Sequence, residues 1–155
     1  MSNLGTIEDA IGVIAKAGNP NIALLHCNST YPASEEDMNL DAINTLKKCF
    51  NVPVGLSDHT FGLFVSQVAL SIGANIIERH FTLDRTSEGP DHILSSEPSE
   101  MTQLVDFSKR IKQILITSNT VSSSKIIKNN KFKKVIHQFF PIDANFLVKK
   151  FVNHW

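Results

Sequence analysis

Apolar and polar positions follow two alternating periods along residues 6–114. Continuous apolar runs have the length and composition of strands covered on both faces, and they lie at about 22–27, 53–57 and 75–81. Apolar residues recur at helical spacing in the intervening segments, at about 6–18, 41–50, 61–73 and 98–111. This alternation of helix and strand predicts an α/β architecture with neighbouring parallel strands.

Two of these helices carry terminal signals. Thr6 and Asp9 have the form of a capping box, which predicts that the first helix begins at Thr6. Glycines at 18 and 73 stand where the first and third helices would stop.

Two predicted strands end in histidines, His59 and His80, which lie one strand–helix–strand unit apart. Parallel strands place their carboxyl ends at one edge of the sheet, so these side chains can converge. Two imidazoles with Glu78 nearby suit a divalent transition metal with open positions, although two unrelated, hydrogen-bonded histidines have the same spacing. Strand alternation puts Glu78 on the face of His80, Arg79 on the other, and Ser57 on the face of His59.

Other polar residues near strand ends have two interpretations each. His26 ends the first strand, where it is either a core histidine or a ligand. Amide and hydroxyl groups fit for sugar hydroxyls follow in a long polar loop, at Asn28, Ser29 and Tyr31, although turns use the same residue types. Asp91 and His92, after a Gly-Pro break, either cover the strand ends as a lid or belong to an ordinary turn.

Size and composition narrow the class of protein. A chain of 155 residues can bury one core, and no apolar run approaches the roughly 18 residues of a membrane helix. The N-terminus also lacks a basic segment followed by an apolar one. Cys27 and Cys49 form neither a metal-binding spacing nor a disulfide framework, so we expect a reducing cytoplasm.

The net charge of zero hides an asymmetry. Residues 1–115 hold 8 Lys+Arg against 14 Asp+Glu, whereas residues 116–155 hold 7 Lys against one Asp. We therefore expect a boundary near residue 116, with a Lys-rich tail that carries a marginal helix at about 144–151. The cluster Lys125–Lys134 could meet phosphate or nucleic acid, but it lacks interleaved aromatic residues, so we expect a solvated tail and no nucleic-acid partner.

Several motifs, in order and at matching spacing over residues 1–113, closely resemble the sialic acid synthase family, which includes N-acetylneuraminate and legionaminate synthases. They are Leu24-Leu-His-Cys27, Tyr31-Pro32, Val54-Gly-Leu-Ser-Asp-His-Thr60, Ile77-Glu-Arg-His-Phe-Thr-Leu-Asp84, Glu88-Gly-Pro-Asp-His92 and Ser96-Glu-Pro98. The resemblance implies the C-terminal portion of a (β/α)8 TIM barrel over residues 1–115, with strands six to eight. Within the family, His92 resembles the sialic and legionaminic branch, since the pseudaminate branch tends to have serine there.

Members of that family condense phosphoenolpyruvate with an N-acetylmannosamine-type sugar, using a divalent metal, commonly Mn²⁺, with Mg²⁺ or Co²⁺ as alternatives. The resemblance implies that His59 and His80 are the metal ligands and that Glu78 holds a metal-bound water. It further implies that Ser57 helps to bind phosphoenolpyruvate. The residues implied to contact the sugar are Asn28, Tyr31 and Asp91, with Ser29 beside them.

The sequence also departs from the family. Five strands are absent, with the lysines that grip phosphoenolpyruvate, and the tail does not resemble the family's antifreeze-like domain. We therefore expect a truncated synthase, inactive alone. Alternatives are a non-catalytic half-barrel subunit that completes a split synthase, or a degenerate gene fragment. The expected protein partner is a complementary N-terminal half or a second copy of the chain in a homodimer. An unrelated metal hydrolase is disfavoured because no hydrolytic nucleophile or dinuclear cluster is apparent.

Charges near the predicted strand ends are mostly negative. Carboxylates are expected there at Asp58, Glu78, Asp84, Glu88 and Asp91. Since Arg79 is expected to face the helices, Arg85 is the cation expected at this edge.

Overall fold

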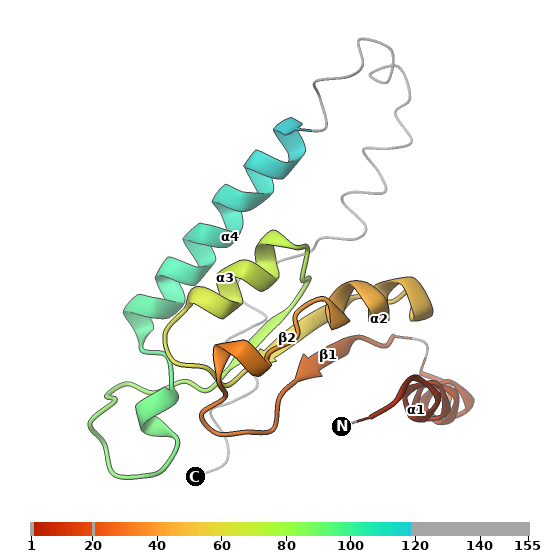
Figure 1. The fold of residues 1–155 in the computed structure, drawn as a ribbon, viewed down its shortest axis with the longest axis horizontal. Helices are drawn as coiled ribbons and strands as arrows, with labels where there is room; N and C mark the ends of the chain where they lie inside the picture. The colour runs from red at the N-terminus through yellow and green to blue at the C-terminus, as the bar shows by residue number, and fades with distance from the viewer. Residues whose placement is uncertain (1, 20, 119–155) are drawn as a thin grey trace. The chain divides into compact units, whose positions relative to one another are not determined.

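A computed structural model describes residues 2–19 and 21–118, and its elements alternate as the sequence predicts (Figure 1). The helices are α1 (Leu4–Lys16), α2 (Ala42–Phe50), α3 (Phe64–Ser71) and α4 (Pro98–Ser118). The strands are β1 (Leu24–Cys27), β2 (Val54–Asp58) and β3 (Ile77–Arg79). Two short 3₁₀ helices, η1 (Glu35–Asp37) and η2 (His92–Leu94), lie in the loops after β1 and β3.

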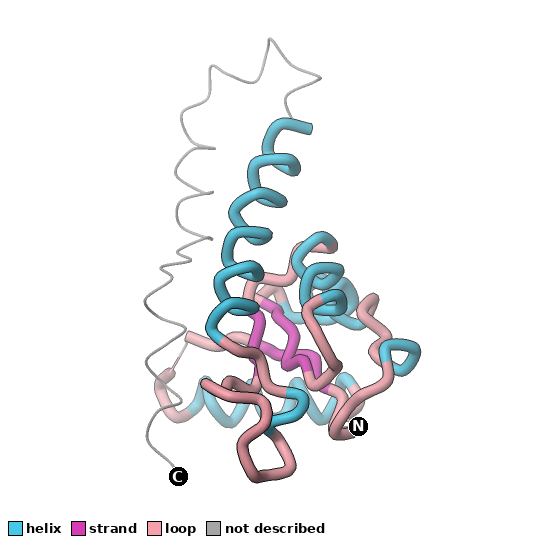
Figure 2. The backbone as a smooth tube through the Cα atoms, turned by 90° about the vertical axis from the view of Figure 1, so that its left-hand side faces the viewer, coloured by secondary structure: helices cyan, strands magenta, loops and turns pink. Residues whose placement is uncertain are grey.

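All three strands are parallel and lie side by side in the order β1-β2-β3 (Figure 2). Leu24 pairs with Val54 at the start of β2. At the other end of β2, Ser57 pairs with Glu78 and Asp58 pairs with Arg79. The predicted parallel α/β architecture is therefore confirmed, and the register brings the carboxyl ends of β2 and β3 level with each other.

One face of the sheet packs against α2 and α3 and forms the core. Leu56 of β2 and Ile43 of α2 are completely buried, and Ala69 of α3 joins the same cluster. Burying a Leu or Ile side chain of this kind contributes about 1.5–3 kcal/mol. Because strand side chains alternate, Leu56 and Asp58 point to this helix-covered face, whereas Ser57 points to the opposite one.

The first helix begins earlier than the capping box predicts. Asn3 is the N-cap of α1, and its side-chain oxygen accepts the backbone N–H of Thr6 at 2.9 Å. Asparagine is among the strongest N-cap residues, so the helix starts at Leu4, two residues before the predicted Thr6. Ile7 packs against the core only partly, and no residue of α1 is fully buried.

Residues 1–104 form one compact unit, and a second begins within α4, at Val105. Most of the predicted tail, including Lys125–Lys134 and the marginal helix at 144–151, lies outside the described residues. Cys27 and Cys49 carry free thiols. None of the described helices is long and apolar enough to cross a membrane.

Candidate functional site

Two imidazoles meet where β2 and β3 end. Asp58 and Arg79 are the last paired residues of these strands, so His59 and His80 occupy the next position of each. Their ring centroids lie 5.3 Å apart with an interplanar angle of 64°. His59 is buried, whereas His80 is partly open to solvent. The predicted convergence is therefore observed.

Each of these imidazoles has a partner on its Nδ1 side. His59 Nδ1 lies 3.0 Å from the carbonyl oxygen of Asn28, and a carbonyl only accepts, so this nitrogen carries the proton. His80 Nδ1 lies 3.8 Å from Asp91 Oδ2, a longer electrostatic contact. A proton on Nδ1 leaves the lone pair on Nε2, the arrangement common in metal-binding histidines.

The donor set fits a metal held by two protein ligands. Metal–imidazole bonds of 2.0–2.1 Å place the ring centroids of two adjacent ligands about 5 Å apart, close to the 5.3 Å between His59 and His80. Within the described residues, no group of three or more His, Cys, Asp or Glu side chains is arranged to hold a metal. The remaining coordination positions would belong to water or substrate.

Ser57 and Glu78 form a hydrogen-bonded polar pair on the sheet surface beside the histidines. The Ser57 hydroxyl donates to Glu78 Oε1 at 2.7 Å, across the strand register. Ser57 is 5% exposed. Both residues lie on the sheet face that α2 and α3 leave uncovered, where alternation predicted them. This pair thus places one hydroxyl and one carboxylate next to the two imidazoles.

Tyr31 covers the imidazoles from the loop after β1. Its ring stacks on His59 at a centroid distance of 4.1 Å and meets His80 edge-on at 5.7 Å. Desolvation by partial burial raises the pKa of the Tyr31 phenol, and electrostatic interactions with Cys27, Asp91 and Glu78 raise it further. At neutral pH the phenol is therefore protonated and able to donate a hydrogen bond beside the imidazoles.

Asn28 is engaged differently from the sequence-based expectation. Its side-chain oxygen accepts the backbone N–H of Thr30 at 3.0 Å, and its side-chain nitrogen donates to the Asp37 carbonyl at 3.4 Å. These bonds shape the loop, and it is the backbone carbonyl of Asn28 that reaches His59. Ser29 is exposed next to it. Any sugar contact by Asn28 or Ser29 stays a prediction.

His26 and His92 have partners of their own. His26 Nε2 lies 2.6 Å from the Met38 carbonyl oxygen, which ties β1 to the residue after η1 and favours the structural interpretation of this histidine. His92 Nδ1 lies 2.8 Å from the Thr82 hydroxyl. Of the two candidates after the Gly-Pro break, it is therefore Asp91 that reaches the histidine pair.

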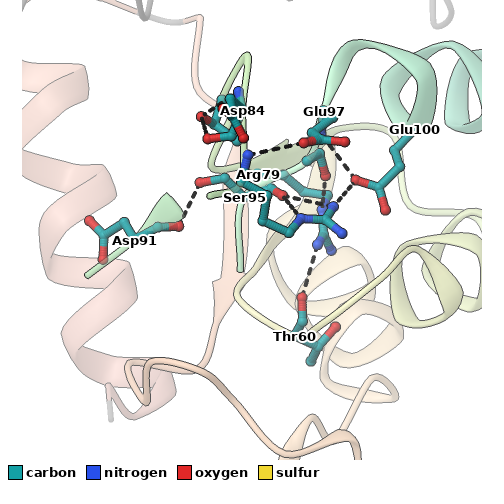
Figure 3. Close-up of polar contacts among 10 residues, drawn as sticks. Thr60, Arg79, Asp84, Asp91, Ser95, Glu97 and Glu100 are labelled. Carbon is teal, nitrogen blue, oxygen red and sulfur yellow. Dashed lines mark hydrogen bonds and ion pairs between the residues drawn. The ribbon is translucent and has the colours of Figure 1, made fainter. Parts of the chain in front are cut away.

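The contacts of Arg79, Asp58 and Arg85 test the charges predicted around the strand ends. Arg79 faces the helices as predicted. Asp58, however, is fully buried on the same face and pairs with Arg79, so its expected position at the edge is wrong. Arg85 pairs with Glu100 and donates to the Ser95 carbonyl, so its charge is neutralised near the start of α4. Figure 3 shows Glu100 beside Glu97, whose backbone N–H donates to the Glu100 carboxylate at 3.0 Å.

Two known protein families match parts of this chain. The NeuB family model matches residues 1–120. A second model, 3-deoxy-D-manno-octulosonic-acid transferase, matches residues 97–155.

Named relatives agree with the first match. The chain is 45% identical to N,N'-diacetyllegionaminic acid synthase of Campylobacter jejuni over 74% of its length and 35% of the relative. It is 40% identical to pseudaminic acid synthase of the same species, over 77% of the chain and 35% of the relative. A crystal structure of N-acetylneuraminic acid synthetase from Leptospira borgpetersenii matches with a TM-score of 0.70 and 38% identity, over 89% of the chain and 46% of the other. The chain spans about a third of the length of these curated relatives.

Proposed function

Because the chain belongs to the NeuB family, the sialic acid synthases, we propose that its strands are part of a (β/α)8 barrel and that its strand ends serve a synthase reaction. In that reaction, the methylene carbon of phosphoenolpyruvate forms a bond to the aldehyde carbon of an N-acetylmannosamine-type sugar. Water adds at the neighbouring carbon and inorganic phosphate leaves, which balances the atoms of a nonulosonic acid product.

The observation that carries this proposal is the pair of imidazoles 5.3 Å apart, each with a partner on its Nδ1 side. His59 and His80 would hold a divalent metal through Nε2, with Mn²⁺ the first choice and Mg²⁺ or Co²⁺ as alternatives. When bound, such an ion supplies Lewis acidity towards the sugar aldehyde.

The neighbouring polar groups have distinct roles in this proposal. Glu78 accepts a hydrogen bond from the water that attacks the phosphoenolpyruvate-derived carbon, and it orients that water. The Ser57 hydroxyl donates its single proton to Glu78 in the free chain, and on substrate binding it turns to donate that hydrogen bond to phosphoenolpyruvate. Tyr31, a protonated phenol above the imidazoles, donates to the sugar. Asp91 accepts hydrogen bonds from the sugar hydroxyls, and Asn28 and Ser29, in the loop after β1, donate to the sugar or accept from it.

An N-acetylated amino sugar is the proposed acceptor substrate. Identity to the legionaminic acid synthase is 45%, against 40% for the pseudaminic acid synthase of the same organism. His92, hydrogen-bonded to Thr82, lies next to Asp91 in the loop that reaches the site. These features favour the sialic and legionaminic side of the family.

Binding phosphoenolpyruvate needs further cations. The substrate carries close to three negative charges, and such anions are bound by positioned cations or helix N-termini. Among the described residues, Arg79 and Arg85 are already in ion pairs. We propose that the phosphate-binding cations come from residues outside the described part of the chain, from a complementary N-terminal half-barrel, or from a second copy of the chain.

Electron paramagnetic resonance of Mn²⁺ tests the metal ligands. Titrating the 155-residue chain with Mn²⁺ should show a site that His80→Ala weakens at least tenfold. His26→Gln serves as the matched control, because His26 is bonded to the Met38 carbonyl away from the pair. Equal, weak binding by the wild type and His80→Ala would contradict the proposal.

A further inference from the structure

A buried ion pair lies directly behind the two imidazoles. Asp58 and Arg79 have side chains that are 0% and 2% exposed, and they meet on the helix-covered face of the sheet. Each of them precedes one of the histidines in the chain, Asp58 before His59 and Arg79 before His80. The pair therefore joins β2 and β3 at the last position before the imidazoles.

On one side, this pair fixes the backbone around His59. Asp58 Oδ1 accepts both the backbone N–H of Thr60 at 2.9 Å and the Thr60 hydroxyl at 2.7 Å. Arg79 donates through NH2 to the carbonyl of Thr60 at 2.9 Å, a bond visible in Figure 3. Because His59 is the residue enclosed between Asp58 and Thr60, its backbone is held from both ends.

On the other side, the same guanidinium reaches the backbone around His80 through Ser96. Arg79 Nε donates to Ser96 Oγ at 2.8 Å. The backbone N–H of Ser96 donates to the His80 carbonyl at 2.8 Å, and the Ser96 carbonyl accepts the N–H of Thr82 at 3.0 Å. Ser96 thus connects the side chain of Arg79 to the main chain on both sides of Phe81.

Stability alone does not explain such an arrangement. Desolvating a carboxylate and a guanidinium costs free energy that their attraction often only balances, and apolar replacements are frequently as stable. A fully bonded polar network instead fixes one geometry. Among the described residues, no buried side-chain nitrogen or oxygen lacks a hydrogen-bond partner. The planar fork of Arg79 reaches Asp58, Thr60 and Ser96 at once, which a lysine could not do.

We propose that Asp58, Thr60, Arg79 and Ser96 form a positioning clamp that sets the separation and orientation of the His59 and His80 imidazoles. The clamp touches neither metal nor substrate and acts through the backbone next to each histidine. This inference rests on the proposed metal site, and it assigns to these buried residues a role in metal affinity.

Two matched serine substitutions test the clamp in the 155-residue chain. Ser96→Ala removes the acceptor of Arg79 on the His80 side. Ser66→Ala removes a hydroxyl on α3 that donates to Asp58 and accepts from Arg79 at 3.4 Å. The described partners of Ser66 do not include the backbone of Thr60, His80 or Thr82, so this variant leaves the links to the histidines in place. Both serines are buried, at 1% and 0% exposure, so the two variants are of similar severity for folding. Supporting partners of metal ligands commonly change metal affinity by about 10–100-fold.

The first readout is the Mn²⁺ dissociation constant from electron paramagnetic resonance. Ser96→Ala should raise it about tenfold or more, whereas Ser66→Ala should stay within about twofold of the wild type. Arg79→Lys is the second variant. It keeps the positive charge but loses the planar guanidinium that reaches three partners, and it should also raise the Mn²⁺ dissociation constant. A second readout needs no metal: the imidazole ¹⁵N shifts of His59 and His80 should move in Ser96→Ala and Arg79→Lys but not in Ser66→Ala.

His80→Ala in the same titration separates the two proposals. If His80→Ala loses Mn²⁺ while Ser96→Ala and Arg79→Lys, both folded, keep wild-type affinity and wild-type imidazole shifts, the clamp is wrong and the metal site stands. If His80→Ala binds Mn²⁺ as tightly as the wild type, the metal site is wrong, and the role of the clamp in metal affinity is wrong with it.

Discussion

Ser57 and Glu78 face each other across β2 and β3, with the serine hydroxyl 2.7 Å from a carboxylate oxygen. This bond satisfies a hydroxyl that is almost buried and fixes the direction of the carboxylate beside the histidine pair. The carboxylate is thereby held in place before any substrate arrives. Such preorganisation is what a water-orienting carboxylate requires.

Two substitutions of Glu78 should separate its structural role from its chemical one. Glu78→Gln keeps an acceptor for the Ser57 hydroxyl, so we expect a change in the free energy of unfolding of about 0.5 kcal/mol or less. Glu78→Ala leaves that hydroxyl without its partner and should cost about 1–3 kcal/mol. Urea denaturation measures both. Equal stability of the two variants would show that the bond to Ser57 does not hold the carboxylate.

Gly55 is predicted to tolerate no side chain. A Cβ at this position of β2 would overlap the carbonyl of Ile76, which itself accepts the N–H of Leu56 at 2.9 Å. Gly55→Ala must therefore push β2 and β3 apart. We expect it to lower the free energy of unfolding, measured by urea denaturation, by at least about 1–3 kcal/mol.

Gly12 supplies the matched control, because a Cβ there meets nothing within 4 Å and the residue lies inside α1. Gly12→Ala should raise the free energy of unfolding by about 0.5–1 kcal/mol. If Gly55→Ala were as stable as the wild type, the described approach of β2 to Ile76 would be wrong.

Tyr31 makes a prediction about pH. It is the single tyrosine of the chain, so absorbance near 295 nm reports its ionisation alone. Partial burial and the nearby Cys27, Asp91 and Glu78 raise the pKa of this phenol above its ordinary value of about 10. Asp91→Asn should lower the midpoint, since it removes one of the negative charges.

The free energy of unfolding should depend on pH because the pKa of Tyr31 is raised in the folded chain. A raised pKa means that the folded chain resists losing the Tyr31 proton, so stability is unaffected below about pH 10 and falls as the pH rises above the unfolded-state pKa. Tyr31→Phe should remove that part of the loss, as denaturation at several alkaline pH values would show. An observed midpoint at or below about 10 would contradict the described position of the Tyr31 phenol close to Asp91 and Glu78.

Synthase activity is not expected from the 155-residue chain on its own. Arg79 and Arg85 are held in ion pairs, and each missing charge-assisted hydrogen bond to phosphoenolpyruvate costs about 1.5–3 kcal/mol. Two such losses lower affinity by several orders of magnitude. The assay follows phosphate release from phosphoenolpyruvate with N-acetylmannosamine and Mn²⁺, beside a full-length synthase. Turnover within tenfold of that enzyme would refute the expectation.

Much of this site follows from the sequence because strand alternation and parallel topology determine it. His59 and His80 had to meet once two parallel strands ended before them, and Ser57 and Glu78 had to share their face. Alternation also places Asp58 beside Leu56 on the helix-covered face, so its burial could have been predicted from the same rule.

Loop contacts were beyond sequence reasoning. The Asn28 carbonyl on His59 and the stacking of Tyr31 depend on the backbone path of a long polar loop, for which no periodic pattern exists. Likewise, the link from Arg79 through Ser96 joins residues 17 positions apart through a turn that the apolar pattern does not encode. The N-cap at Asn3 was missed because two competing caps, Asn3 and Thr6, lie one helical turn apart.

The most direct measurement is anomalous diffraction from crystals of the chain soaked in Mn²⁺. We predict one manganese peak about 2.0–2.3 Å from Nε2 of both His59 and His80, with Nδ1 of His59 still bonded to the Asn28 carbonyl. A His80→Ala crystal treated in the same way should lack that peak. No peak at the histidine pair, or manganese bound only by other residues, would contradict the account.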